Sequence, residues 1–179
     1  PTGFLHLGHV FDALHVWGVA RAFGGRVLLR IEDHDRARSR PEFEAALLED
    51  LAWLGLTADA PPQRQTDRTR FYESALGRLT AEGRVYACSC SRRQIAAATP
   101  GPNGTEPRYP GICRDRELPL ESFAARRIRL PEGTARFVDL LRGPTEQAPQ
   151  QQCGDLLAID RDGHWTYQFA VTVDDFEQG

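Results

Sequence analysis

The stretch Pro1-Thr2-Gly3-Phe4-Leu5-His6-Leu7-Gly8-His9 opens the chain and decides how the rest is interpreted. A turn with proline and glycine leads into two histidines that flank Leu7-Gly8. Apolar residues then recur at helical spacing, at Val10, Phe11, Leu14 and Trp17. The pattern predicts a turn into a helix from about residue 7 to residue 23, which ends at Gly24-Gly25.

The start of this helix has the features of an anion site. Its first N–H groups have no partner within the helix, and the dipole places partial positive charge there. Gly8 has no side chain to keep a phosphate from the backbone, and His6 and His9 can donate hydrogen bonds to phosphate oxygens. The alternative is that the two histidines are ordinary polar residues on a loop.

A buried strand is predicted directly after the helix, at residues 26–31. Helix followed by apolar strand is typical of an α/β protein with a parallel sheet. An acidic cluster, Glu32, Asp33, His34 and Asp35, follows at the carboxyl end of this strand. Ligands bind at that edge of an open parallel sheet, so the cluster is a candidate substrate site. A solvated acidic turn that caps the next helix is the alternative.

These motifs resemble those of class I aminoacyl-tRNA synthetases, in particular the glutamyl branch. His6-Leu7-Gly8-His9 corresponds to the "HIGH" signature, and Pro-Thr-Gly-x-Leu-His is that branch's lead-in. Residues 30–38 resemble its "R-I-E-D-x-D" segment, and residues 165–175 resemble "T-Y-x-x-A-x-x-V-D-D". The resemblance implies a Rossmann-like parallel sheet with flanking helices, which binds ATP with Mg²⁺ and activates L-glutamate.

The resemblance also implies roles for individual residues. His6, Gly8 and His9 would act on ATP, Glu32 would contact the ammonium of the amino acid, and Tyr167 would line its pocket. Asp33 and Asp35 are interpreted as helix-capping or orienting residues. Asp174 and Asp175 either orient the pocket wall or approach the acceptor nucleoside.

Composition limits the remaining possibilities. The chain has 179 residues, 41% hydrophobic and 26% charged, which is typical of a soluble globular domain. The net charge of −3 excludes an overall basic character, so contact with tRNA needs a local patch. No apolar stretch reaches transmembrane length and no signal peptide is evident, so we expect a cytoplasmic protein. We also expect a monomer.

Further elements follow in order along the chain. Helices are predicted at residues 41–54 and after Asp67, which would cap the second of these helices. Short strands are predicted at 85–87, 125–130, 135–140 and 155–159. Pro131-Glu132-Gly133 would join two of these strands, whose arginines would either contact a tRNA backbone or form a solvated face. A polar loop is expected at residues 146–152.

Four cysteines in a reducing compartment indicate metal binding or no special role, rather than disulfides. Cys88, Cys90 and Cys113 have a spacing that allows three thiolates to converge on zinc. Buried cysteines without metal are the alternative. The resemblance supports Zn²⁺ and implies Tyr109 as fourth ligand, because Asp115 stands where some glutamyl-tRNA synthetases have histidine. Cys153 and His164 are weaker candidates.

Three regions are therefore expected: 1–87 as the first half of the nucleotide-binding domain, 88–127 as a zinc-binding insertion, and 128–179 as further strands and pocket wall. The family's strand before Pro1 and its second nucleotide signature after Gly179 would belong to the complete protein. The Tyr109/Cys113 pair and the ending Asp174-Asp175-x-x-Gln178-Gly179 favour the members that attach glutamate to queuosine in tRNA(Asp). The alternatives are charging of the 3′ end of tRNA(Glu), and a non-catalytic zinc-bearing paralogue that binds nucleotide or RNA.

Overall fold

The computed structural model describes residues 2–33, 39–99 and 107–179. The chain forms two compact units, Pro1–Arg70 and Phe71–Gly179. The division into regions 1–87, 88–127 and 128–179 stays a prediction. His34 and Asp35, two members of the acidic cluster, lie outside the described residues. Within the described residues, no helix is both long enough and apolar enough to cross a membrane.

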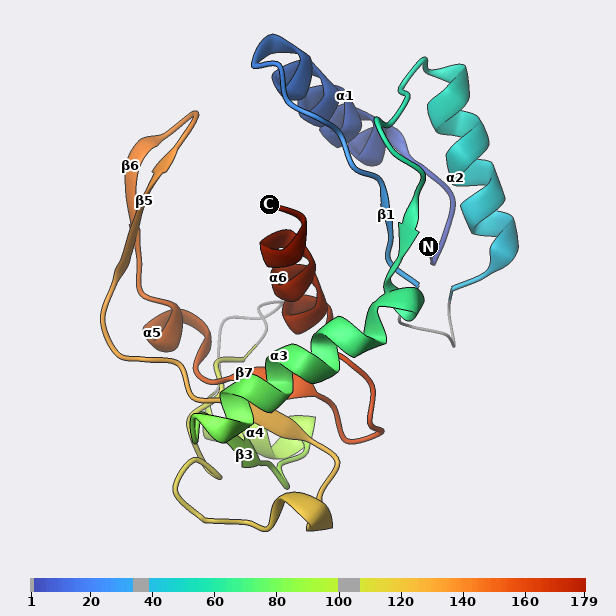
Figure 1. The fold of residues 1–179 in the computed structure, drawn as a ribbon. Coiled ribbons are helices and arrows are strands. Elements are labelled where there is room, and N and C mark those ends of the chain that lie inside the picture. The colour runs from blue at the N-terminus through green and yellow to red at the C-terminus, as the bar shows by residue number, and fades with distance from the viewer. Residues whose placement is uncertain (1, 34–38, 100–106) are drawn as a thin grey trace. The chain divides into compact units, whose positions relative to one another are not determined.

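The N-terminal unit contains two long helices and a short parallel strand pair (Figure 1). Helix α1 (Leu7–Ala22) and helix α2 (Pro41–Trp53) lie close to their expected bounds, and proline at the start of α2 fits the first turn. Strand β1 (Arg30–Ile31) is shorter than predicted and pairs in parallel with β2 (Gln63–Arg64). The parallel expectation is therefore met for this pair.

Asp59 fixes the segment that leads into β1. Its carboxylate accepts hydrogen bonds from the Val27 amide at 2.7 Å and from Arg21 of α1 at 3.1 Å. The Asp59 amide in turn donates to the Val27 carbonyl at 2.8 Å, and the amide of Gln63 donates to Leu29 at 3.0 Å. Backbone hydrogen bonds to residues 59–63 thus begin before β1 itself, within the segment predicted as part of the strand.

The C-terminal unit is built on an antiparallel sheet of order β3-β4-β7, with strands Val85–Ala87, Arg126–Ile128 and Leu156–Ile159. This departs from the expected parallel sheet. In the described part of the chain between β3 and β4, the helical segments are the short helix α4 (Arg92–Ala98) and a single 3₁₀ turn, and β4 pairs antiparallel to β3.

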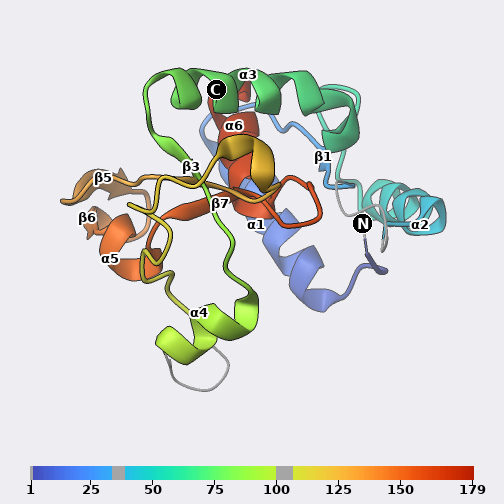
Figure 2. The same ribbon diagram turned by 90° about the horizontal axis from the view of Figure 1, so that it is seen from below.

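Alternation along the strands gives this sheet two different faces. On one face, Ile128 and Ala158 pack with Tyr72 of α3 (Thr69–Ala81) and Phe169 of α6 (Tyr167–Gln178). On the other face, Tyr86 packs in a cluster with all three predicted thiolate ligands. Figure 2 shows α3 and α6 on one side of the sheet and α4 on the other.

Several local predictions differ from the structure. Asp67 does not cap α3, because it lies within a 3₁₀ turn, η1 (Gln65–Arg68), that precedes the helix. The strands at 126–128 and 135–139 do not pair with each other. The second of them, β5 (Ala135–Asp139), instead forms an antiparallel hairpin with β6 (Gly143–Gln147). The expected polar loop at 146–152 contains the end of β6 and most of α5 (Pro149–Cys153). A further 3₁₀ turn, η2, spans Leu120–Ser122.

Candidate functional site

The predicted phosphate-binding residues cap α1. His6 is the N-cap residue, and its Nδ1 accepts a hydrogen bond from the Gly8 amide at 3.1 Å. The His6 amide donates to Nδ1 of His9 at 3.3 Å, and the two imidazole rings stack with centroids 3.7 Å apart. The sequence prediction that His6, Gly8 and His9 meet at a helix start agrees with this geometry.

These contacts fix which ring nitrogen of each histidine carries the proton. Nδ1 acts as an acceptor in both rings, so in the neutral form the proton is on Nε2. Both exposed histidines therefore have an Nε2–H donor available for a ligand oxygen. Gly8 leaves room for the His6 ring, because a Cβ there would lie 3.0 Å from Cε1 and 3.1 Å from Nδ1 of His6 and the ring would have to shift.

The acidic residues after β1 separate into two roles. Asp33 accepts hydrogen bonds from the amide of Thr66 at 2.9 Å and from its hydroxyl at 2.7 Å, so it ties the end of β1 to η1. Its expected orienting role fits these contacts. Glu32 leaves 37% of its side chain exposed and forms an ion pair with Arg30 at 3.6 Å. Its carboxylate thus stands at the carboxyl end of a parallel strand, accessible to a cationic group.

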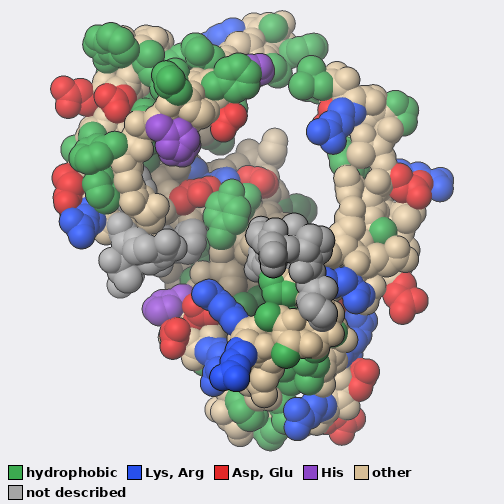
Figure 3. All heavy atoms as spheres, turned by 180° about the vertical axis from the view of Figure 1, so that it is seen from behind, with side chains coloured by type: hydrophobic (Ala, Val, Ile, Leu, Met, Phe, Trp, Pro, Cys, Tyr) green, Lys and Arg blue, Asp and Glu red, His purple; other side chains and the backbone are tan. Residues whose placement is uncertain are grey.

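A cavity of about 350 Å³ lies away from these residues. It is formed by the C-terminal half of α1 and residues 55–57, and its lining includes Leu14, Trp17 and Arg21. Figure 3 shows hydrophobic side chains gathered at the surface of this unit, where Phe11, Leu14 and other α1 residues are exposed. None of the predicted site residues lines this cavity.

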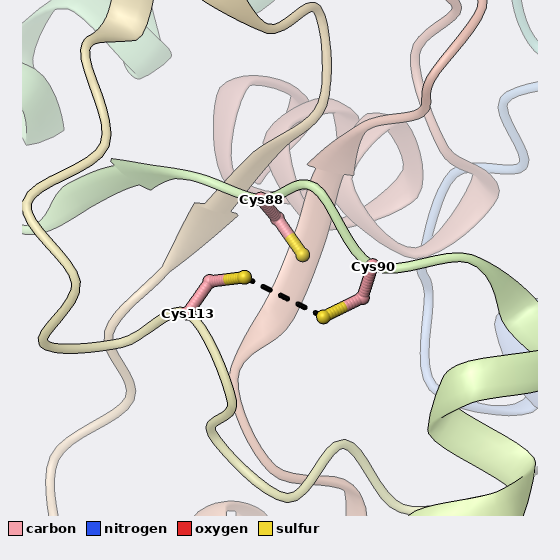
Figure 4. Close-up of side chains that lie close together, drawn as sticks. All are labelled: Cys88, Cys90 and Cys113. Atoms are coloured by element: carbon pink, nitrogen blue, oxygen red, sulfur yellow. Dashed lines mark hydrogen bonds between the residues drawn. The ribbon is translucent and has the colours of Figure 1, made fainter.

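In the C-terminal unit, the three predicted metal-binding cysteines converge (Figure 4). The sulfur atoms of Cys88, Cys90 and Cys113 lie within 4.8 Å of one another, and all three residues are buried. The Tyr109 hydroxyl oxygen lies 3.7 Å from the sulfur of Cys88 and 4.0 Å from that of Cys90. It also accepts a hydrogen bond from the Cys113 amide at 2.8 Å.

This donor set fits a zinc ion. Tetrahedral zinc with Zn–S bonds of about 2.3 Å places its ligand sulfurs about 3.8 Å apart. The sulfurs of Cys90 and Cys113 are 3.4 Å apart, and the Tyr109 oxygen is at a comparable distance from two sulfurs. Cys153 is exposed and bonds to the Pro149 carbonyl, and His164 is near Asp160, so neither joins this cluster.

Protonation within the cluster is uneven. Burial and a hydrogen bond with Cys113 raise the pKa of Cys90 to about 12. Burial opposes ionisation of Cys113 as well, but hydrogen bonds from Ser89, Cys90 and Tyr109 lower its pKa to about 6. Burial also raises the pKa of Tyr109. Of these two cysteines, Cys113 is therefore the one that more readily forms a thiolate, and a metal would displace the proton of Cys90.

Sequence reasoning missed two residues that position Tyr109. Its amide donates to the Cys153 carbonyl at 3.0 Å, which places its backbone against Gly154. A Cβ on Gly154 would lie 2.1 Å from the Tyr109 carbonyl oxygen. On the other side, the Arg127 guanidinium stacks 3.6 Å from the centre of the Tyr109 ring. In the sequence, the one hint of these contacts is Gly154 itself, which lies between the predicted loop at 146–152 and the predicted strand at 155–159.

The arginines of β4 and β5 do not form one RNA-facing row. Arg127 is only 7% exposed, because β4 directs it into the cysteine cluster, so the interpretation as a tRNA contact is wrong for it. Arg126 donates to backbone carbonyls, among them those of residues 120 and 123, and Arg129 pairs with Asp115. Arg136 of β5 leaves 80% of its side chain exposed and pairs with Glu146.

The predicted pocket-wall segment contributes α6. Tyr167 is its first residue and is 51% exposed. Asp174 is fully buried and accepts a hydrogen bond from the Tyr72 hydroxyl at 2.9 Å, which gives it a role in joining α6 to α3. Glu32 and Tyr167 belong to different units.

Comparison with known proteins gives a consistent result. The family model described as "tRNA synthetases class I (E and Q), catalytic domain" matches residues 1–179. The chain is 44% identical to the Glutamyl-Q tRNA(Asp) synthetase of Rhodobacter capsulatus and 43% identical to that of Symbiobacterium thermophilum. Over its full length it is also 42% identical to Glutamate--tRNA ligase 1 of Acidithiobacillus ferrooxidans.

The chain spans 71% and 61% of the two Glutamyl-Q relatives and 39% of the ligase. A solved glutamate tRNA ligase from Elizabethkingia meningosepticum, in complex with its amino acid, matches with a TM-score of 0.76 and 26% identity. That match covers 99% of this chain and 40% of the ligase. From the family match over its whole length, the chain belongs to the class I tRNA synthetases (E and Q), as part of their catalytic domain.

Proposed function

We propose that this chain is the catalytic part of an enzyme that activates L-glutamate with ATP and transfers the glutamyl group to queuosine in tRNA(Asp). The observation that carries the proposal is its identity of 44% and 43%, over the whole chain, to relatives named Glutamyl-Q tRNA(Asp) synthetase. The glutamate--tRNA ligases match 99–100% of this chain at 39–42% identity, but the chain spans only 38–39% of their length. They support charging of the tRNA(Glu) 3′ end as the second candidate.

The helix start supports the activation step. The carboxylate of glutamate is ionised at neutral pH, so its attack on the α-phosphorus of ATP needs no general base. Pyrophosphate leaves, and the reaction then depends on alignment and on stabilising phosphate charge. The Nε2–H groups of His6 and His9, at the positive end of the α1 dipole, are suited to that task. Class I synthetases use Mg²⁺ with ATP, which neutralises part of the phosphate charge.

Recognition of the amino acid is assigned to two residues. The half-exposed carboxylate of Glu32 is a natural partner for an ammonium group, and Arg30 at 3.6 Å orients it. Tyr167 offers a partly exposed ring and hydroxyl at the start of α6.

In this proposal the sheets belong to a Rossmann-like catalytic domain. Operation as a cytoplasmic monomer stays a prediction.

The cysteine cluster is assigned to zinc. Cys88, Cys90, Cys113 and Tyr109 would hold the ion, which would stabilise residues 88–127 as a small insertion on the sheet. Support comes from the buried convergence of the four side chains, since three thiols and a phenol at these distances match the preferences of zinc. In this proposal the metal would have a structural role.

Pyrophosphate exchange with glutamate tests the proposed reaction on the complete protein. A queuosine-type enzyme should exchange pyrophosphate without tRNA, whereas an ordinary glutamyl-tRNA synthetase should need tRNA. A paralogue without catalytic activity would show no exchange in either case. Transfer of labelled glutamate to tRNA(Asp) that contains queuosine, compared with tRNA(Asp) that lacks it, then identifies the acceptor. Transfer that does not depend on queuosine contradicts the proposal.

Glu32→Ala tests the substrate site. We expect loss of glutamate-dependent exchange with unchanged far-UV circular dichroism. Glu42→Ala is a matched control, because Glu42 also forms a 3.6 Å ion pair, with Arg40, on an exposed helix start. Exchange that survives Glu32→Ala with an unchanged KM for glutamate excludes this role.

Metal analysis tests the zinc assignment. The purified protein should contain about one zinc per chain. Cys113→Ser should lose it, while Cys153→Ser, which changes an exposed thiol outside the cluster, should retain it. Equal zinc content in both variants excludes the proposed ligand set.

A further inference from the structure

Arg127 is a buried cation whose contacts all converge on the cysteine cluster and its surroundings. Its Nε donates to the Cys88 sulfur at 3.4 Å, and its Nη1 donates to the Asp155 carbonyl at 2.7 Å. The plane of the guanidinium lies over the Tyr109 ring, with Cζ 3.6 Å from the ring centre. Arginine is rarely this buried unless a partner compensates its charge.

The charge of the cluster supplies that partner. A zinc ion with three thiolates has a net charge of −1, and a phenolate as fourth ligand makes it −2. All four ligand residues are buried, so this negative charge is partly removed from water. The guanidinium of Arg127 contributes +1 in contact with one ligand sulfur and one ligand ring, which reduces the net charge that has to be buried.

Geometry adds a second effect. The hydrogen bond to the Asp155 carbonyl fixes the guanidinium, since Asp155 is itself held by Tyr86, Arg114 and the Leu130 amide. A fixed guanidinium over the ring restricts the orientation of Tyr109. Its hydroxyl is thereby kept beside the sulfurs of the cluster.

We propose that Arg127 is a positioning residue for the metal site, which acts through a hydrogen bond to the Cys88 thiolate and by stacking on Tyr109. The inference rests on the proposed zinc site and deepens it. Partners in the outer shell of a metal typically change its affinity by 10–100-fold when they are mutated. Arg127→Gln should therefore bind zinc about 10–100-fold more weakly than the wild type.

The experiment uses competition between the full chain and a chromophoric zinc chelator, together with the absorption spectrum of the cobalt(II) form. A hydrogen bond lowers the energy of the sulfur lone pairs, so its loss should shift the sulfur-to-cobalt charge-transfer band to longer wavelength. Arg129→Gln is the matched control. Arg129 lies near the same sheet edge and over the Tyr86 ring at 5.0 Å, but it bonds to Asp115 and the Arg114 carbonyl.

A purely structural Arg127 would give a different result. Arg127→Gln would then lower the melting temperature while the folded protein kept its zinc affinity and band position, and that outcome overturns the proposal. Equal losses in Arg127→Gln and Arg129→Gln overturn it too. If Arg127→Gln does not fold, Arg127→Lys replaces it, because lysine keeps the charge without a flat group that stacks and bonds to sulfur. Wild-type affinity and spectrum in Arg127→Lys likewise overturn it. Failure of the wild type to bind zinc would instead refute the metal site itself.

Discussion

Gly154→Ala tests how Tyr109 is held in the metal cluster. Gly154 follows α5 and has φ of 73° and ψ of −163°, a backbone conformation that residues with a Cβ rarely adopt. The added methyl group would lie 2.1 Å from the Tyr109 carbonyl oxygen and 3.2 Å from its Cβ. Because the first contact is with backbone, a change of side-chain rotamer does not relieve it, and Tyr109 or Gly154 has to move.

The expected cost combines two terms. The unfavourable backbone conformation costs about 1–3 kcal/mol. Displacement of Tyr109 also weakens its hydrogen bond to the Cys153 carbonyl, which contributes about 1 kcal/mol. Gly154→Ala should therefore lower the free energy of unfolding by about 2–4 kcal/mol.

Urea denaturation followed by circular dichroism measures this change, and chelator competition reports whether zinc affinity falls with it. Gly163→Ala is the control, because Gly163 has a φ of 84° but no atom within 4 Å of the added methyl group. Its loss should be limited to about 1–2 kcal/mol of backbone strain. Equal losses in the two variants would refute the argument that contact with Tyr109 makes glycine necessary at position 154.

Three further outcomes follow from the structure. Tyr72→Phe removes a hydrogen bond to the buried carboxylate of Asp174 and should lower the free energy of unfolding by about 1.5–3 kcal/mol in chemical denaturation; a loss below about 0.5 kcal/mol would contradict it. The hydrogen bond from the Val27 amide, and then Arg21, lower the pKa of Asp59 below its ordinary value of 3.8. Ionised Asp59 therefore stabilises the folded state fully at pH values above 3.8, and this contribution is lost as the pH falls through the lowered pKa. The wild type should therefore be more stable than Asp59→Asn at pH 7, and the two free energies of unfolding should converge in acid. A difference in stability that grows in acid would contradict this prediction. Zinc binding at pH 7 should release protons, because the pKa of Cys90 is raised to about 12 and the metal binds the thiolate; calorimetric heats independent of buffer ionisation enthalpy would exclude this.

Much of the local structure could be predicted because it depends on neighbouring residues. The cap of α1 needs only His6, Gly8 and His9 within one turn, and its bounds follow from the glycines after Phe23. The convergence of Cys88 and Cys90 follows from their spacing. The prediction differed most from the structure in strand pairing. The segment of β5 was expected beside β4 but pairs with β6, and the C-terminal sheet is antiparallel rather than parallel. Pairing depends on contacts between distant segments, which local periodicity does not encode.

The signature at the start of α1, the acidic residue after β1 and the set of thiols can all be recognised from the sequence, because they depend on residue type and short spacing. Their surroundings depend on the folded arrangement of the chain. In the sequence, Arg127 is one of several arginines in predicted strands. In the structure, side chains alternate along β4, so Arg127 points toward the cysteine cluster while Ile128 packs on the opposite face with residues of α6. Gly154 reads as a turn glycine, and only the approach of Tyr109, distant along the chain, makes it necessary. In both cases the physical reason is a contact between segments far apart in sequence.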